Sequence, residues 1–228
     1  METLVVGALE QQGLSLTPEA ALAFLVQQAH SLPSDRRVLI GIAGGPGVGK
    51  STLATGLVAA LNATAPVAAY VPMDGFHMRH AKLEALGTVA DKGMPHTFEA
   101  EAFVQFLTRL KTASIDIAGP GYSRAIEDLV QDAFIIKAET RLIITEGNYL
   151  LLGESPWGKI VSLLDLAVFI DVPRQMVQNR LLKRHAAHGL FTEARNRAHV
   201  ERVDLANYDL VRRSRGRAGI AIDLLTDA

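Results

Sequence analysis

The sequence predicts an α/β protein in which helices cover both faces of a mostly parallel central sheet, giving three layers. Short, almost unbroken apolar runs alternate along the chain with longer stretches of helical pattern. Such runs are typical of strands that are buried on both faces, as they are in parallel sheets. The 228 residues, 49% of them apolar, suffice for a sizeable core. We therefore predict a single domain over residues 1–228.

Helical patterns separate the apolar runs in a regular order. Thr17-Pro18-Glu19 combines an N-cap, a proline at the first helical position and an early acid, which predicts a helix within the N-terminal segment 1–34. The expected strands span residues 37–43, 67–73, 141–145 and 166–170, with shorter ones at 134–137 and 220–224. The other expected helices span residues 51–61, 99–111, 173–185 and 193–206, the last two joined through Gly189.

The charge balance and the absence of cysteine narrow the classes of function. The chain has 23 basic and 24 acidic residues, so no overall field favours nucleic acid or an anionic membrane as a partner. Without cysteine, disulfides, thiol catalysis and cysteine-bound zinc are excluded. The apolar run Leu4 to Leu9 is neither a signal peptide nor long enough to span a bilayer. We expect a cytoplasmic protein with a small-molecule partner, and the sequence leaves a homodimer open.

A glycine-rich segment between the first core strand and the next helix carries the most specific signal. Residues 44–51, Gly-Gly-Pro-Gly-Val-Gly-Lys-Ser, fit the pattern G-x-x-x-x-G-K-[ST] of a phosphate-binding loop, or P-loop. Such a loop turns backbone N–H groups toward phosphates, while Lys50 reaches the β- and γ-phosphates and Ser51 can ligate magnesium. We therefore predict a three-layer P-loop NTPase fold. The residues expected to contact the nucleotide are Gly44, Gly45, Pro46, Gly47, Val48, Gly49, Lys50, Ser51 and Thr52.

Two acidic residues follow expected strands at the sheet edge where open α/β proteins bind their ligands. Glu146 ends the third core strand and is the candidate for holding Mg²⁺ through water; the alternative is an acid that faces solvent. Asp74 follows the second strand and is the candidate base for an attacking hydroxyl, or else only starts a turn with Gly75. His77 is a candidate for orienting the acceptor, with a surface histidine as the alternative.

Four segments of the chain, taken in their order, point to a family. They are the glycine loop, Asp74-Gly75-Phe76-His77, Gly119-Pro120-Gly121-Tyr122-Ser123 and Thr145-Glu146-Gly147-Asn148-Tyr149-Leu150. Together they resemble the group of uridine kinase, phosphoribulokinase and bacterial pantothenate kinase, and most nearly bacterial nucleoside or nucleotide kinase-like proteins labelled fructose transport system kinase.

The resemblance implies a reaction and roles for individual residues. It implies Asp74 as the base or acceptor partner, Glu146 near magnesium and Tyr122 at the acceptor pocket, with ATP as phosphoryl donor. Uridine kinases carry a histidine where this chain has Glu127, which makes uridine a doubtful acceptor. Nucleosides, sugars, sugar phosphates and pantothenate-like alcohols all stay open.

A basic helix completes the expected site. Arg180, Lys183 and Arg184 recur at three- and four-residue spacing, which places them along one face of the helix expected over 173–185. In the resembled kinases this region is a mobile lid whose arginines neutralise phosphate charge. The resemblance thus implies catalytic roles for Arg180 and Arg184 and a lid over about residues 185–197; a solvated basic face is the alternative.

Two other classes of function use the same loop. A GTP-dependent switch or metallochaperone would need a guanine selector of the N-K-x-D type, and the chain has none. A regulatory nucleotide-binding module would lose the acceptor chemistry, whereas Asp74, Tyr122 and Glu146 are all present. An ABC-type ATPase would carry an L-S-G-G-Q-like segment, which is absent. The sequence therefore favours a small-molecule kinase that uses ATP and Mg²⁺.

Overall fold

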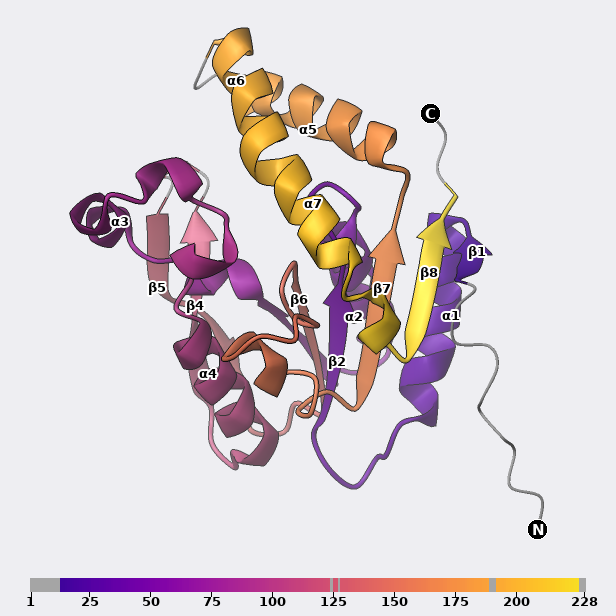
Figure 1. The fold of residues 1–228 in the computed structure, drawn as a ribbon. Coiled ribbons are helices and arrows are strands. Elements are labelled where there is room, and N and C mark those ends of the chain that lie inside the picture. The colour runs from indigo at the N-terminus through magenta and orange to yellow at the C-terminus, as the bar shows by residue number, and fades with distance from the viewer. Residues whose placement is uncertain (1–12, 124, 127, 189–191, 226–228) are drawn as a thin grey trace.

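The structure, a computed structural model, describes residues 13–123, 125–126, 128–188 and 192–225. Six parallel strands form one sheet in the order β1-β8-β7-β2-β6-β3, and two more strands form a separate antiparallel sheet (Figure 1). The central strands are β1 (Leu14–Leu16), β2 (Val38–Ala43), β3 (Ala68–Pro72), β6 (Leu142–Gly147), β7 (Leu166–Asp171) and β8 (Ile220–Leu224). The run Leu4 to Leu9, Glu127 and Gly189 lie outside the described residues.

Each face of the sheet buries its own apolar core. Ile40 and Ile42 of β2 pack with helices on one face, whereas Leu39 packs on the other. Because alternate side chains of a strand point to opposite faces, a strand buried along its whole length needs cover on both sides. The predicted three-layer α/β/α fold is therefore confirmed.

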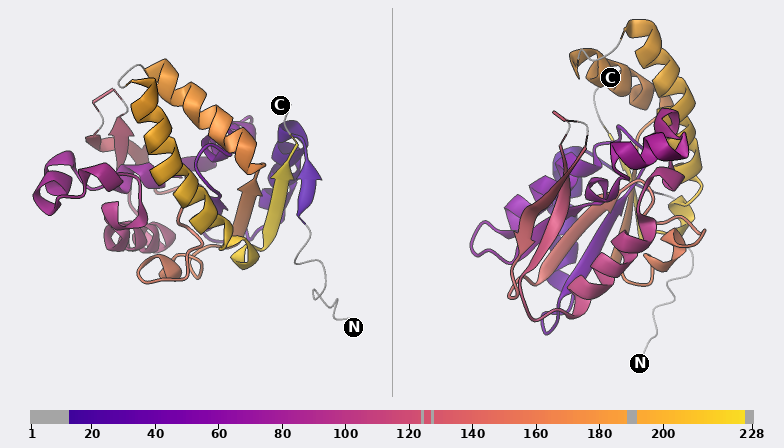
Figure 2. Two further views of the ribbon diagram at one scale, coloured as in Figure 1. Left: turned by 45° about the horizontal axis from the view of Figure 1, so that its top comes forward. Right: turned by 90° about the vertical axis from the view of Figure 1, so that its left-hand side faces the viewer.

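Helices α1 and α2 lie together on one face and α4 covers the other, while α5 to α7 rise above the carboxyl edge of the sheet (Figure 1 and Figure 2). The helices are α1 (Pro18–Ser31), α2 (Lys50–Leu61), α3 (His80–Leu86), α4 (Ala100–Thr112), α5 (Arg174–His188), α6 (Glu193–His199) and α7 (Leu205–Arg212). The predicted cap of α1 is present, since the Thr17 hydroxyl accepts from the Ala20 backbone N–H at 3.2 Å. None of the helices in the described part of the chain combines the length and apolar character that crossing a bilayer requires.

The structure differs from the expected elements at a hairpin and at a helix. Strands β4 (Ile117–Ser123) and β5 (Asp128–Ile136) form an antiparallel pair, whereas the sequence predicted only a short strand at 134–137. Glycine and proline inside β4 and the mostly exposed side chains of β5 hide the strand pattern. The helix expected over 193–206 is present, but it continues to Arg212 and contains a π turn at Val200–Asp204 between α6 and α7.

Candidate active site

The P-loop connects β2 to α2 in the context that the sequence predicted. Gly47 and Gly49 adopt φ values of +76° and +104°, which residues other than glycine rarely adopt, and Gly49 is the N-cap of α2. A turn of this kind directs the backbone N–H groups at the start of the helix toward one point. Val48 is buried, whereas Ser51 and Thr52 are exposed on the first turn of α2.

Lys50 lies at the centre of the site. Its side chain is buried, and Nζ donates to the Gly45 carbonyl oxygen at 2.9 Å and to Asn148 Oδ1 at 2.7 Å. Burial lowers the pKa of Lys50, the carboxylates of Glu146 and Asp74 oppose that change, and Arg184 adds to it. The structure therefore brings the predicted lysine, both predicted acids and one lid arginine within electrostatic reach of one another.

Glu146 is held at the carboxyl end of β6 on the face that α2 covers. Its register partners are Ile42 of β2 and Pro72 of β3, and its side chain is 5% exposed, so the alternative of a solvent-facing acid is wrong. Glu146 Oε1 accepts from Ser51 Oγ at 3.0 Å and from the Tyr70 hydroxyl at 2.7 Å. Burial raises the pKa of Glu146, while Lys50 opposes the rise.

Asp74 and His77 face the other end of the site. Asp74 lies in a 3-10 helix, Met73–Phe76, directly after β3, and its side chain is 42% exposed. His77 Nε2 is 4.0 Å from Asp74 Oδ1, and the His77 side chain is only 12% exposed, so the alternative of a surface histidine is wrong. Its ring lies against Phe98, with the ring centroids 3.9 Å apart.

Tyr122 is brought to this group by strand β4. Its ring centroid lies 5.0 Å from that of His77, and Lys92 Nζ lies 5.1 Å from the centre of the tyrosine ring. A β-carbon at Gly75 would lie 2.1 Å from the Pro120 carbonyl oxygen, so only glycine permits this approach of the hairpin to the 3-10 helix. The structure thus places Asp74, His77 and Tyr122 close to one another.

Helix α5 lies against the P-loop. Side chains of Val177 and Leu181 approach Gly47, and Arg180 Nη1 is 3.4 Å from the Gly47 carbonyl oxygen. Arg184, one turn further along, contributes positive potential at Lys50. The two arginines therefore face the phosphate-binding loop, whereas Lys183 is exposed. This orientation favours the lid interpretation over a purely solvated basic face.

The P-loop and the residues gathered around it can be compared with those of known families. The model described as "Phosphoribulokinase / Uridine kinase family" matches residues 39–223. The chain belongs to this family. It is accordingly a P-loop kinase of small molecules, a phosphotransferase with an alcohol group as acceptor, and ATP use is a property that the family implies.

Individual relatives match most of this kinase. A Schizosaccharomyces pombe protein named provisionally as a uridine kinase is 34% identical over 191 residues, which cover 80% of this chain and 81% of the relative. A pantothenate kinase of Clavibacter sepedonicus is 30% identical, and the match covers 85% of this chain and 61% of that enzyme. The crystal structure of a protein from a Silicibacter species, described provisionally as a fructose transport system kinase, superposes with a TM-score of 0.80 at 33% identity, covering 90% of this chain and 98% of that one.

Two residues of the kinase site were missed by sequence reasoning. Tyr70 donates to Glu146, and Asn148 accepts from Lys50. Because β3 and β6 are parallel neighbours, Tyr70 and Glu146 both point to the α2 face, and no sequence pattern reveals that pairing before the strand order is known. Asn148 follows Glu146 by two residues, and this closeness in sequence was the available indication that Asn148 belongs to the site.

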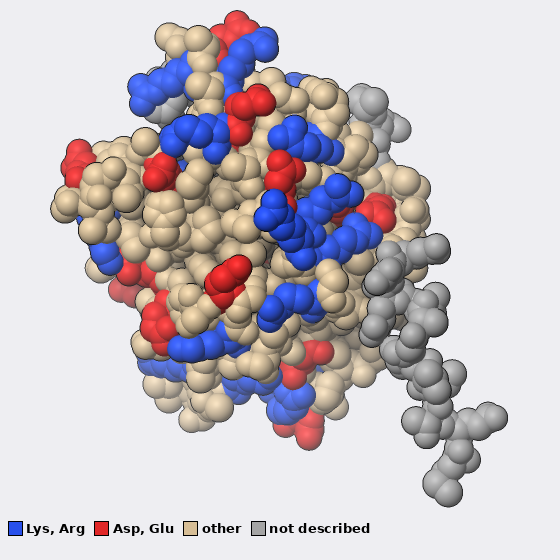
Figure 3. Space-filling model, viewed as in Figure 1, with Lys and Arg blue, Asp and Glu red and all other residues tan. Residues whose placement is uncertain are grey.

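Two arginines at the end of α7 and in the turn that follows have acidic partners. Figure 3 shows basic side chains gathered over the end of α7 and the turn that follows, with acidic side chains among them. Arg212 Nε is 3.1 Å from Asp171 Oδ2, and Arg215 Nη1 is 2.6 Å from Asp223 Oδ1. These ion pairs join the α7 region to β7 and β8 and are structural contacts of the kinase fold.

Proposed function

We propose that this chain is a cytoplasmic kinase that transfers the γ-phosphoryl group of ATP, with Mg²⁺, to a hydroxyl group of a nucleoside, a sugar or a pantothenate-like alcohol. The observation that carries the proposal is the position of Asp74. Its carboxylate lies close enough to Lys50 to oppose the fall in the lysine pKa, and it lies 4.0 Å from His77, whose ring is next to that of Tyr122. Asp74 therefore stands between a phosphate-binding end and an acceptor-binding end.

The nucleotide end supplies charge and metal ligands. Lys50 and the backbone N–H groups of the P-loop would hold the β- and γ-phosphates, with Arg180 and Arg184 closing from α5. The Ser51 hydroxyl and the Glu146 carboxylate, 3.0 Å apart, are the oxygen donors that Mg²⁺ prefers, and Tyr70 fixes the orientation of that carboxylate. Mg²⁺, when bound, neutralises the charge of the phosphates.

The acceptor end supplies a base and a surface. The Asp74 carboxylate accepts the proton of the acceptor hydroxyl, whose oxygen forms a bond to the γ-phosphorus while the bond from that phosphorus to the bridging oxygen of ADP breaks. His77 and Tyr122 position the acceptor, and the burial of His77 against Phe98 keeps its ring in one orientation. A transfer of this kind gains most from the alignment of its two substrates.

The test is Asp74→Asn in an assay with ATP and Mg²⁺ against nucleosides, sugars, sugar phosphates and pantothenate-like alcohols, with products detected by mass. Loss of a catalytic base lowers transfer by about 10²- to 10⁴-fold, and ATP affinity is expected to stay nearly unchanged. The matched control is Asp116→Asn, whose carboxylate pairs with Lys137 on the surface, and which should transfer normally. Full transfer by Asp74→Asn, or ATP binding with no product from the wild-type protein, would contradict the proposal.

A further inference from the structure

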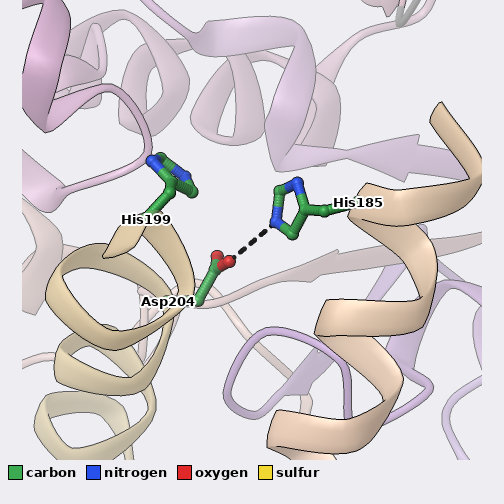
Figure 4. Close-up of side chains that lie close together, drawn as sticks. All are labelled: His185, His199 and Asp204. Atoms are coloured by element: carbon green, nitrogen blue, oxygen red, sulfur yellow. Dashed lines mark hydrogen bonds and ion pairs between the residues drawn. The ribbon is translucent and has the colours of Figure 1, made fainter. Parts of the chain in front are cut away.

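Three side chains with metal-binding atoms converge outside the active site. They are His185 of α5 and His199 and Asp204 at the two ends of the π turn (Figure 4). One ligand atom from each lies within 4.8 Å of those of the other two. His185 Nε2 is 2.9 Å from Asp204 Oδ2, and the two imidazole centroids are 5.4 Å apart.

The π turn is the reason that His199 and Asp204 meet. In an α-helix, residues five apart point about 140° away from each other, so this pair would lie on different faces. A π turn closes with a hydrogen bond between residues five apart, as the Leu205 N–H donates to the Val200 carbonyl oxygen here, and it therefore stacks such residues. Turns of this kind inside helices occur frequently at functional sites.

The surroundings suit nitrogen and oxygen donors that bind a metal. Asp204 is 8% exposed, and the His185 side chain is 25% exposed, so the cluster is shielded yet reachable. A neutral imidazole and a carboxylate are the forms in which these side chains bind metals.

We propose that His185, His199 and Asp204 form a site for a divalent transition metal of the zinc class, which fastens α5 to the π turn. Zinc takes imidazole nitrogen and carboxylate oxygen at about 2.0–2.2 Å, which sets ligand atoms about 3.4 Å apart in a tetrahedral site. Closing the cluster from its present spacing needs side-chain shifts on the order of 1 Å. Mg²⁺ and Ca²⁺ require six or more oxygen ligands, so two imidazoles select against them.

Occupancy of this site would act on the lid. His185 directly follows Arg184 in the sequence, so a metal ion on His185 holds the end of α5 that carries the arginine. On the other side, Arg202 of the π turn pairs with Asp91 at 2.9 Å, and Asn207 donates to the Gly93 carbonyl oxygen at 2.9 Å. The metal would thereby link α5, through the π turn, to the segment that precedes α4.

The test is zinc binding by the full chain, stripped with chelator and held in excess Mg²⁺ so that the Glu146 site does not compete. Calorimetry should give a single zinc ion per chain, and zinc should raise the melting temperature. In His199→Gln and Asp204→Asn the affinity should fall at least about tenfold, a conservative bound because even second-shell changes reach that size. The matched control is His80→Gln, which removes an exposed histidine 3.5 Å from Glu84, and which should bind zinc as the wild type does.

A second measurement keeps the proposal testable if the variants at the more buried positions fail to fold. Co²⁺ bound to the wild-type chain should give the intense visible absorption of a low-coordinate site with nitrogen ligands, and His185→Gln, at a partly exposed position, should abolish it. Circular dichroism without metal establishes that each variant is folded. The absence of zinc binding, zinc binding that His199→Gln and His185→Gln leave unchanged, or an equal loss in His80→Gln would each overturn the proposal. None of these outcomes depends on the proposed reaction.

Discussion

The buried carboxylate of Glu146 accepts a hydrogen bond from the hydroxyl of Tyr70. The charged form of a carboxyl group is disfavoured by burial, yet the charged form is the one that attracts a metal ion. The Tyr70 hydroxyl donates to Oε1 at 2.7 Å, and burial beside this carboxylate raises the tyrosine pKa. Tyr70 therefore stays a hydrogen-bond donor at every physiological pH, opposes the rise in the Glu146 pKa and orients the carboxylate.

Tyr70→Phe should weaken the affinity of the kinase for Mg²⁺ without removing any group that contacts a substrate. Loss of an outer-shell hydrogen bond of this kind lowers metal affinity by about 10- to 100-fold, so the Mg²⁺ concentration for half-maximal rate should rise. The rate at saturating Mg²⁺ should change less. A Mg²⁺ titration of the transfer rate measures both, with Tyr208→Phe as control because that hydroxyl contacts Asp171 and Val172. An unaltered Mg²⁺ titration in Tyr70→Phe would remove the assigned role.

At the scale of elements, the acceptor side depends on how the β4–β5 hairpin meets the 3-10 helix after β3. A Cβ at Gly75 would lie 2.1 Å from the Pro120 carbonyl oxygen, which is backbone and has little room to move. Tyr122 follows Pro120 by two residues on the same strand. The spacing between Tyr122 and His77 is therefore set at Gly75.

Gly75→Ala should push the hairpin away and loosen the acceptor site. The KM for the acceptor should rise about tenfold or more, while the KM for ATP stays close to that of the wild type, because a shift of about 1 Å at a positioning element costs on the order of 10²-fold. Steady-state kinetics with each substrate varied in turn separates the two. The control is Gly216→Ala, where a β-carbon meets nothing within 4 Å. Equal effects on both KM values would argue against a local acceptor role.

Asp165 joins three elements at the opposite edge of the sheet. Its carboxylate lies 2.8 Å from Arg36 Nη1 and 3.3 Å from Lys111 Nζ, and it accepts from the Leu39 N–H at 2.9 Å. Burial alone would raise the pKa of Asp165, but these partners outweigh burial and leave it below the ordinary value of 3.8. A carboxylate whose pKa is lower in the folded state stabilises that state at pH values above its ordinary pKa. This stabilisation is lost as the pH falls through the pKa of the folded state.

Asp165→Asn should therefore lower the free energy of unfolding by about 1–3 kcal/mol at neutral pH, the range for hydrogen bonds to a charged group. The difference from the wild type should shrink as the pH falls below the ordinary value of 3.8 and then through the lower pKa of the native carboxylate, where that group becomes protonated as well. Denaturant unfolding of both proteins at a series of pH values measures this difference in the free energy of unfolding. Asp116→Asn, which removes an exposed ion pair, is expected to change stability by less than about 1 kcal/mol. A constant difference across the pH range would contradict the linkage.

The elements that the sequence predicted are those with a strong local signal. The strand before the P-loop, the loop and the capped helix α1 each depend on residues close together in the chain, and all three are confirmed. The hairpin and the π turn depend on contacts between distant segments, such as Pro120 against Gly75. The candidate site follows the same rule, since Glu146 lies at the end of a strand and Asp74 follows one, whereas the partners Tyr70 and Asn148 require the strand order.

In the whole molecule, the proposed nucleotide site lies between the carboxyl edge of the sheet and the helices above it. The sheet side is held by β2 and β6 and the buried cores on both faces, whereas α5 meets the P-loop through a few contacts such as that of Leu181 with Gly47. A ligand that contacts both sides binds the folded chain and not the unfolded one. Nucleotide binding should therefore stabilise the molecule as a unit.

ATP with Mg²⁺ should raise the melting temperature in proportion to its affinity. At about 100 times its dissociation constant, a ligand adds about 2.7 kcal/mol, which for a domain of this length corresponds to roughly 5–10 °C. Lys50→Ala should lose most of this shift, measured from its own baseline, because the buried Nζ is the side-chain cation of the loop. Lys137→Ala, which removes an exposed lysine paired with Asp116, should keep it. A full shift in Lys50→Ala would contradict the contact proposed between Lys50 Nζ and the phosphates.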